Sequence, residues 1–202
     1  MCHKVFEKTQ NMCFNIGKGE IMNKKYVTGK TITGKDIHRI RKNLNMTQQE
    51  FAEFLNCSKR TIQEWEKSEK EIKGVIVTLL DIIQRNPDII EKLTLYPNDL
   101  KIRLYYMYEN IICTVIDVDE FQRKVKIKNY IDKPYFRAFG VNSEPTYDDY
   151  EEFLESRCFP KERDKIKIEL KRLNIPFYDP FMIIEKTQGR MAEDKFWIKI
   201  ER

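Results

Sequence analysis

Residues 47–67 read TQQEFAEFLNCSKRTIQEWEK, and this stretch determines how the first half of the chain folds. Thr47 followed by Glu50 has the spacing of a capping box, in which each side chain bonds the other residue's backbone amide at a helix start. Ser58 is a favourable N-cap for a second helix. Asn56 lies in the short turn between them, and asparagine tolerates the left-handed backbone that such a turn requires. The stretch therefore predicts two short helices joined by a tight turn.

Apolar residues at helical spacing give these two helices a shared core. Ala52 is small where the helices must cross closely, and Leu55, Ile62 and Trp65 face inward. This pattern leaves the N-terminal side chains of the second helix pointing outward. It is typical of a helix-turn-helix, whose second helix enters the major groove of DNA.

Residues 33–94 resemble the Cro/repressor type of helix-turn-helix protein, also called the xenobiotic-response-element family. The match rests on the TQQEFA step, the Ser58 cap, the Ile62 and Trp65 pair and the acid Glu66, which fall in register. The family's turn usually carries a glycine, where this chain has Asn56. The resemblance implies that the recognition helix begins at Ser58. Contacts with base edges are then expected from Lys59, Arg60, Thr61, Gln63 and Glu64.

Contacts with the DNA backbone are expected from the segment that precedes the motif. Gln48 matches a position that contacts phosphate in the family. Between residues 24 and 42, seven side chains are basic and one is acidic. Such an excess of positive charge is the electrostatic footprint of phosphate binding. The expected phosphate contacts are Gln48, Lys35, Arg39 and Lys42.

Arg41 and Glu66 match an internal ion pair of the same family. In that family the pair ties the first helix of the domain to the third. The resemblance therefore implies that Arg41 and Glu66 are paired and partly buried.

The helical pattern extends over residues 23–95, where we expect an all-α domain of five helices. Residues 75–84 are strongly apolar, and Pro87 favours the start of a fifth, short helix. We expect this domain to use its spare apolar residues for its own core: Val75, Ile76, Leu79, Leu80 and Ile83. Residues 1–22 show no strong periodicity, and we expect them to be a poorly ordered leader.

The pattern changes at Leu95–Asp99, and from Ile102 it favours strands. Residues 102–108, 111–118 and 124–130 read as a three-stranded antiparallel meander. Helical patterns follow at 147–156, 161–173 and after Pro180, and residues 196–200 read as a closing strand. The chain is therefore expected to be multi-domain, with the helix-turn-helix domain followed by a small α+β domain over residues 100–202.

The C-terminal part resembles the small module that precedes the kinase domain in HipA-type kinase proteins. The matching features are a helix ending in Arg157, the step from Pro160 to Arg163, the helix Ile166–Leu173, and the closing Gly189, Asp194 and Trp197. No kinase signature is present. The resemblance implies an interaction module without phosphoryl transfer.

Enzymatic chemistry finds no support in the sequence. The five cysteines have wide spacings without a CxxC pair, and Cys2, His3 and Cys13 make at most a partial zinc site because a fourth ligand is missing. The acidic run from Asp148 to Glu152 suits a helix start. We expect no catalytic residue, no cofactor and no metal. No apolar run approaches the ~18–20 residues of a membrane span, so we expect a cytoplasmic protein without a membrane partner.

Two functions are consistent with these features. The first is a transcriptional repressor that binds double-stranded DNA at a palindromic operator and regulates its own gene. The second is an interaction protein, either an antitoxin or a mobile-element inhibitor of a host defence protein, whose C-terminal domain binds a protein target. We expect a homodimer whose contact is at the strand Ile102–Tyr108, because an unprotected apolar edge strand needs a partner. The same edge could instead receive a different protein, as the second function requires.

Overall fold

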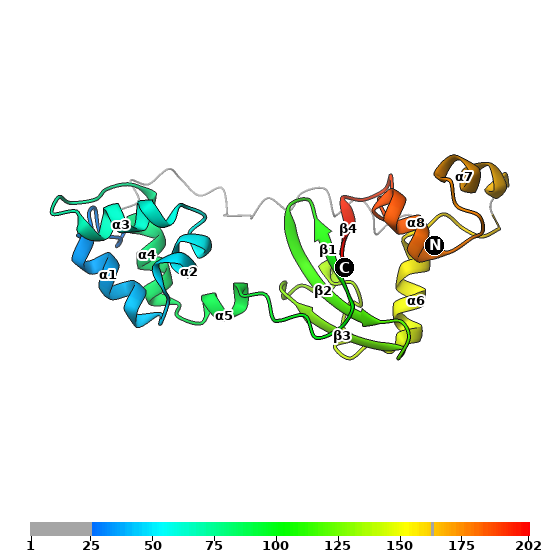
Figure 1. Cartoon of the computed structure of the whole chain (residues 1–202), viewed down its shortest axis with the longest axis horizontal. Helices are drawn as coiled ribbons and strands as arrows, with labels where there is room; N and C mark the ends of the chain where they lie inside the picture. The colour runs from blue at the N-terminus through cyan, green and yellow to red at the C-terminus, as the bar shows by residue number, and fades with distance from the viewer. Residues whose placement is uncertain (1–25, 163) are drawn as a thin grey trace, which may run out of the picture. The chain divides into compact units, whose positions relative to one another are not determined.

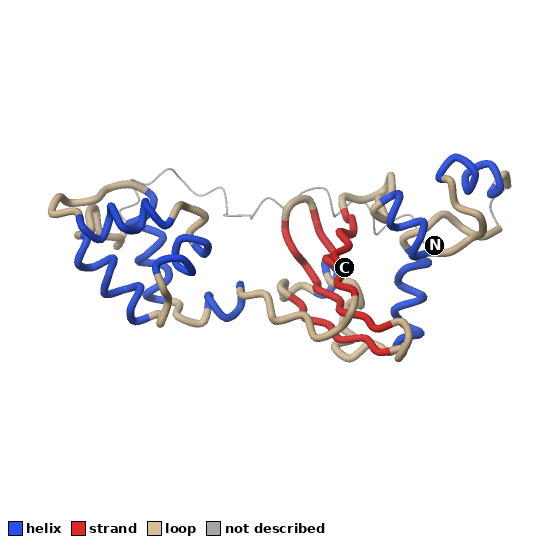
Figure 2. The backbone as a smooth tube through the Cα atoms, viewed as in Figure 1, coloured by secondary structure: helices blue, strands red, loops and turns tan. Residues whose placement is uncertain are grey.

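The computed structural model describes residues 26–162 and 164–202 (Figure 1). The expected leader at residues 1–22 lies outside the described residues. The chain divides into two compact units between Ile89 and Ile90. The first unit is helical, and the second combines helices with a β-sheet (Figure 2). A helical domain followed by a small α+β domain is thus confirmed.

The first unit contains α1 (Gly34–Asn43), α2 (Gln48–Phe54), α3 (Lys59–Lys67) and α4 (Val75–Arg85). The short helix α5 (Ile89–Leu93) spans the division between the units. Among the described residues the unit therefore holds four complete helices, and the predicted count of five is not confirmed.

Local hydrogen bonds fix the ends of these helices. The Thr47 hydroxyl accepts from the Glu50 amide at 3.2 Å, and the Glu50 carboxylate accepts from the Thr47 amide at 2.7 Å. After α2, Asn56 adopts a φ of 52°, and the Cys57 amide donates to the Ala52 carbonyl at 2.9 Å. This is the left-handed helix ending in which asparagine replaces glycine.

The core of the first unit is formed by side chains that are almost fully buried: Ile37, Ile40, Phe51, Ala52, Ile62, Leu80 and Ile83. The prediction for α4 is only partly correct. Ile76 is buried, but Val75 is 88% exposed and Leu79 is 40% exposed. The two residues lie on the side of α4 that faces away from the core, together with the exposed Ile82.

The start of α1 packs directly on the end of α3, and Gly34 makes this approach possible. A β-carbon at Gly34 would lie 2.4 Å from the Trp65 carbonyl oxygen and 2.8 Å from that of Ser68. Both obstacles are backbone oxygens at the end of α3, and unlike a flexible side chain they cannot rotate away. The spacing between α1 and α3 is therefore set by the absence of a side chain at this position.

We predict that Gly34→Ala destabilises the first unit by about 1–3 kcal/mol, the usual cost of overpacking a close contact. Gly29→Ala is the matched control, because a β-carbon there meets its nearest atoms at 3.6 and 3.8 Å, which is ordinary contact. Urea unfolding of the two variants measures the difference. Equal stabilities would show that α1 can move off α3 without cost.

The sheet of the second unit has four strands among the described residues: β1 (Ile102–Tyr108), β2 (Ile111–Asp119), β3 (Lys124–Asn129) and β4 (Phe196–Glu201). Their order is β3-β2-β1-β4, and each neighbouring pair is antiparallel. β1 therefore lies inside the sheet, with Arg103–Tyr108 paired with β4. The predicted unprotected edge at Ile102–Tyr108 is wrong, because the chain returns about ninety residues later to cover it.

The inner face of the sheet carries the core of the second unit. The helices are α6 (Tyr147–Ser156), α7 (Ile166–Leu173) and α8 (Pro180–Thr187), with a short 3₁₀ turn, η2, at Pro134–Phe136. α6 and α8 lie together over one face of the sheet (Figure 1). Tyr150, Ile183 and Ile184 from these helices join the cluster that contains Ile116 and Ile198 from the strands.

The outer face of the sheet is held by a buried ion pair and by the segment that precedes β1. Arg103 donates to both carboxylate oxygens of Asp117, at 2.6 and 2.7 Å, and to the Tyr96 carbonyl at 2.9 Å. The Tyr130 hydroxyl donates to the Thr94 carbonyl at 3.0 Å. These contacts attach the segment around Tyr96 to the sheet, so the structure divides a few residues before the predicted Leu95–Asp99 boundary.

Candidate nucleic-acid interface

Helix α3, the expected recognition helix, has one inner face and one exposed polar face. Its N-cap Ser58 accepts from the Thr61 amide at 3.0 Å. Ile62 is fully buried, and the Glu66 side chain on the same face is 7% exposed. The opposite face carries the exposed side chains of Lys59, Arg60 and Glu64. The helix therefore presents charged groups to a binding partner while its other side is fixed in the core.

Arg60 and Glu64 pair with each other on the exposed face. Arg60 Nε donates to Glu64 Oε1 at 2.8 Å, and the two side chains are 85% and 63% exposed. Exposed pairs of this kind contribute about 0–1 kcal/mol. Arg60 can therefore exchange Glu64 for the edge of a base at little cost.

The remaining expected base-contacting residues are partly buried. The Thr61 hydroxyl lies 2.8 Å from the Ser58 hydroxyl, so it takes part in the cap of the helix. Gln63 donates from Nε2 to Gln48 Oε1 at 3.4 Å. In the free protein these two side chains are thus held by the domain itself, while Lys59 makes no ion pair with a described residue.

A buried cluster around Glu66 joins the first three helices. Arg41 Nε donates to Glu66 Oε1 at 2.6 Å, and Arg41 Nη2 donates to Glu66 Oε2 at 3.1 Å. Arg41 Nη1 also donates to the Met46 carbonyl at 2.8 Å. The Arg41 and Glu66 side chains are 5% and 7% exposed. The pair is bidentate and almost inaccessible to water.

Gln48 and His38 complete this cluster. Gln48 Nε2 donates to Glu66 Oε2 at 2.8 Å, and His38 Nδ1 lies 3.2 Å from the same oxygen. Burial acts to raise the pKa of Glu66, but hydrogen bonds from Arg41, Gln48 and His38 outweigh it and lower the pKa to about 2. The sequence assigned Gln48 to a phosphate contact, and it did not reveal that Gln48 and His38 bind Glu66. The only sequence feature that could have indicated the bond to Glu66 was the placement of a polar side chain, Gln48, at a helix position that faces the other helices.

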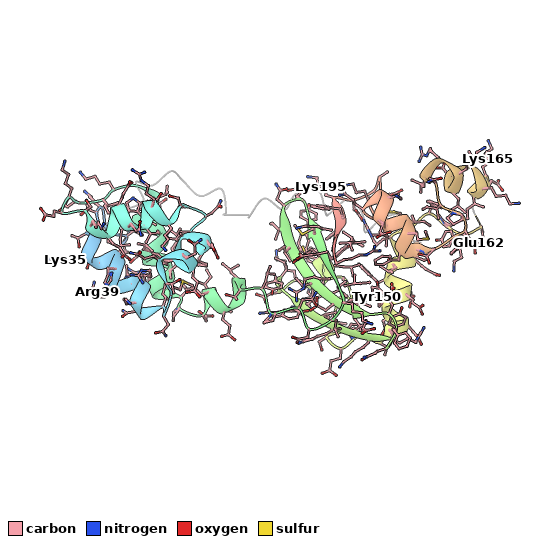
Figure 3. All side chains as sticks on the ribbon, viewed as in Figure 1. Lys35, Arg39, Tyr150, Glu162, Lys165 and Lys195 are labelled. Carbon is pink, nitrogen blue, oxygen red and sulfur yellow. The ribbon has the colours of Figure 1, made fainter. Side chains whose placement is uncertain are left out.

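Three basic residues of α1 lie on the side opposite its core, away from the buried Arg41. Lys35, Arg39 and Lys42 recur at spacings of four and three residues, so they share one face of the helix. All three are exposed, and Figure 3 labels Lys35 and Arg39 on this helix. Arg39 Nη2 contacts Asp36 Oδ1 at 2.8 Å, which is an exposed pair. No contact within the described residues joins this basic stripe to the exposed face of α3.

Arg157 and Cys158 of the second unit are both buried. Burial raises the pKa of the Cys158 thiol to about 12, and Glu155 and Asp179 add to the effect. Arg157 donates to the Gly189 carbonyl at 2.8 Å and to Asp194 Oδ2 at 2.6 Å. Arg157, Gly189 and Asp194, three of the residues that carried the resemblance of this half, thus meet in one structural network.

Within residues 26–162 and 164–202, no three side chains suited to binding a metal ion gather together. Cys2, His3 and Cys13 lie outside the described residues. None of the helices in the described part of the chain has the length and hydrophobicity that a membrane span requires.

Removing one partner of the buried pair should be costly. We predict that Glu66→Ala destabilises the first unit by about 3–5 kcal/mol, because Arg41 is left buried without a counter-charge. Glu64→Ala, which removes the same side chain from the exposed face of the same helix, should change stability by less than about 0.5 kcal/mol. Urea unfolding of both variants tests this, and similar losses would mean that the cluster is not structurally important.

The low pKa of Glu66 predicts a pH dependence of stability. The folded value of about 2 lies below the ordinary value of 4.5. The stabilisation is therefore complete above pH 4.5 and is lost as the pH falls from 4.5 towards 2. The difference in unfolding free energy between wild type and Glu66→Gln should shrink over this range. Urea titrations at a series of pH values measure it, and a constant difference would contradict the assignment.

Comparisons with known proteins agree with this geometry. Residues 2–94 match the family model described as the antitoxin component of a bacterial toxin–antitoxin system, MqsA. This match includes most of the segment expected to be a leader. Over 59 residues the chain is 37% identical to Antitoxin HigA-2 of Vibrio cholerae serotype O1. The aligned region covers 29% of this chain and 57% of that relative. The N-terminal part of the chain is therefore similar to bacterial antitoxins.

Proposed function

We propose that the protein is a sequence-specific DNA-binding regulator of the antitoxin type, which represses its own gene in the cytoplasm. The observation that carries this proposal is the exposed face of α3, where Lys59 and Arg60 stand at the start of a helix whose inner face is locked by Glu66. Arginine and lysine are the usual readers of guanine in the major groove. Similarity to antitoxins over residues 2–94 supports the same function.

The contacts with DNA are divided between two helices in this proposal. Side chains on α3 read base edges: Lys59, Arg60, Thr61, Gln63 and Glu64. The basic stripe on α1, with Lys35, Arg39 and Lys42, binds phosphates, and Gln48 contributes when it exchanges Glu66 for a phosphate. One helix reads only a few base pairs, so we propose that two copies bind a palindromic operator about one helical turn apart.

The similarity to antitoxins also favours a protein partner. We propose that the second unit binds a toxin encoded beside this gene, and that the protein acts as a regulator without catalytic activity. The resemblance of the C-terminal half to an interaction module supports this role. Co-expression with the product of the adjacent gene, followed by purification of the complex, tests it directly. Separate elution of the two proteins would remove this part of the proposal.

We predict that replacing Lys59 and Arg60 with alanine abolishes specific DNA binding and leaves the fold intact, since both side chains are exposed. Each lost base contact should weaken binding by about 1–3 kcal/mol. Gel shifts with the DNA upstream of the gene measure the effect. Lys67→Ala is the matched control, because it removes one positive charge from the other end of the same helix. Normal binding by the double variant would refute the proposed reading face.

A further inference from the structure

β4 is an edge strand of the sheet within the described residues, since only β1 pairs with it. The Ile198 amide donates to the Gln188 carbonyl at 2.7 Å, so the backbone of Ile198 faces away from β1. Alternate residues of an antiparallel strand turn their N–H and C=O groups to the same side. The backbone of Phe196, Ile198 and Ile200 therefore faces the outer edge of β4.

The first half of this edge is satisfied and the second half is open. The Phe196 amide donates to Asp194 Oδ1 at 2.9 Å, and the Phe196 carbonyl accepts from Arg157 at 3.1 Å. The Ile198 carbonyl and both backbone groups of Ile200 have no protein partner among the described residues. An open edge of this kind is a template for another strand.

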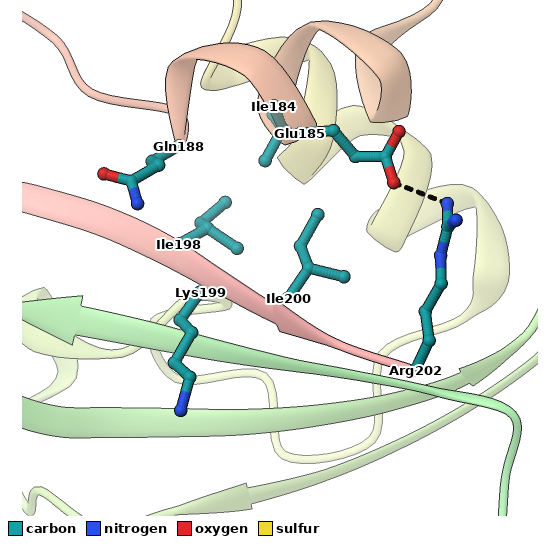
Figure 4. A pocket seen from close by; sticks show the side chains of 7 residues that line it. All are labelled: Ile184, Glu185, Gln188, Ile198, Lys199, Ile200 and Arg202. Atoms are coloured by element: carbon teal, nitrogen blue, oxygen red, sulfur yellow. Dashed lines mark ion pairs between the residues drawn. The ribbon is translucent and has the colours of Figure 1, made fainter.

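A groove of about 420 Å³ lies along the open half of the edge, between β4 and α8 (Figure 4). Ile184, Ile198 and Ile200 form its apolar lining. The ion pair between Glu185 and Arg202, at 2.5 Å, joins the helix to the strand at one end. Lys199 points to the opposite face of the sheet (Figure 4). An incoming strand can thus bury apolar side chains in the groove while its charged ones stay on the outer face.

The other edge of the sheet is protected in a different way. β3 carries Lys124, Lys126 and Lys128 on one face, next to Arg123 in the preceding turn. Lysines on an edge strand repel a second copy and discourage pairing. On the corresponding face, β4 instead carries one positive and one negative side chain, Lys199 and Glu201. Of the two edges, β4 is therefore the one suited to pairing.

We propose that β4 pairs with β4 of a second copy of this chain, antiparallel and centred on Ile200, so that the two sheets become one. This names the contact surface of the dimer in the proposed function and rests on that proposal. The occupant is inferred from charge complementarity. With Ile200 opposite Ile200 of the second copy, Lys199 faces Glu201 of that copy, and the two-fold symmetry repeats this pair.

The register also satisfies the open backbone groups of Ile200. Residues directly opposite in an antiparallel pair either exchange both hydrogen bonds or neither, and the two Ile200 residues form an exchanging pair because their groups face outward. The Glu201 carboxylate accepts from the Tyr105 hydroxyl through Oε2 at 2.7 Å, which leaves Oε1 for the lysine. A self-complementary contact of this kind closes at two copies.

Charge reversal on the full-length protein tests the proposal. Lys199→Glu and Glu201→Lys should each weaken dimerisation roughly tenfold, because each creates two facing pairs of like charge. The double variant should restore dimerisation, since the pairs are reformed with opposite polarity. Lys186→Glu is the control, because it makes the same change at an exposed position of α8 outside the groove. Light scattering over a range of micromolar concentrations, without DNA, measures the mass.

Each outcome of this experiment decides the matter. Loss of the dimer in both single variants and its return in the double variant supports the register. A wild-type monomer overturns the homodimer, and protection of the Ile200 amide only after addition of another protein would assign the edge to that protein. If none of the charge reversals weakens the dimer, the dimer must use another surface, such as the exposed apolar residues Val75, Leu79 and Ile82 of α4. If the single variants weaken the dimer but the double variant does not restore it, the proposed pairing is also overturned. The effect of replacing Lys59 and Arg60 on DNA binding is measured in a separate experiment. The proposed DNA-reading face and the proposed dimer contact can therefore fail independently.

Discussion

The buried bidentate pair between Arg41 and Glu66 is the interaction on which the geometry of the first unit depends. It joins α1 to α3, and the hydrogen bond from Gln48 brings α2 into the same cluster. A buried charge cannot leave its partner without a large loss of free energy. The three helices therefore cannot shift independently, and the close contact at Gly34 fixes the remaining distance. The orientation of the exposed face of α3 is thus fixed by the domain itself.

In the second unit, two more arginines join separate segments of the chain. Arg103 joins β1 to β2 and to the segment before the sheet through Tyr96. Arg157 joins the end of α6 to the approach to β4 through Gly189 and Asp194. In each case a planar guanidinium binds a carboxylate and a carbonyl from segments far apart in sequence. Apolar burial supplies the stability of this unit, and the arginines specify which segments meet.

Local contacts could be predicted from the residues themselves, whereas the distant contact between Arg41 and Glu66 was predicted only through the family resemblance. The Thr47 capping box and the left-handed Asn56 depend on neighbours within four residues, so both could be read from the sequence. The exposure of Val75 could not be predicted from the sequence, because α4 has apolar residues on more than one side. The periodicity does not show which of these sides the rest of the domain covers. The position of β1 was wrong for a similar reason, since β4 follows it only after three helices. The hydrogen bond between Gln48 and Glu66 could be recognised only from the folded structure.

A protein that regulates its own gene must occupy its DNA site more fully as the concentration of the protein rises. A single recognition helix reads few base pairs and binds weakly, whereas two linked copies make the second contact intramolecular and so gain affinity without new contacts. If the copies associate through an edge that is only half open, the dimer is modest in affinity and forms above a threshold concentration. Below that concentration the operator stays free and the gene is expressed. A short, self-complementary edge is therefore better suited to autoregulation than a large permanent interface.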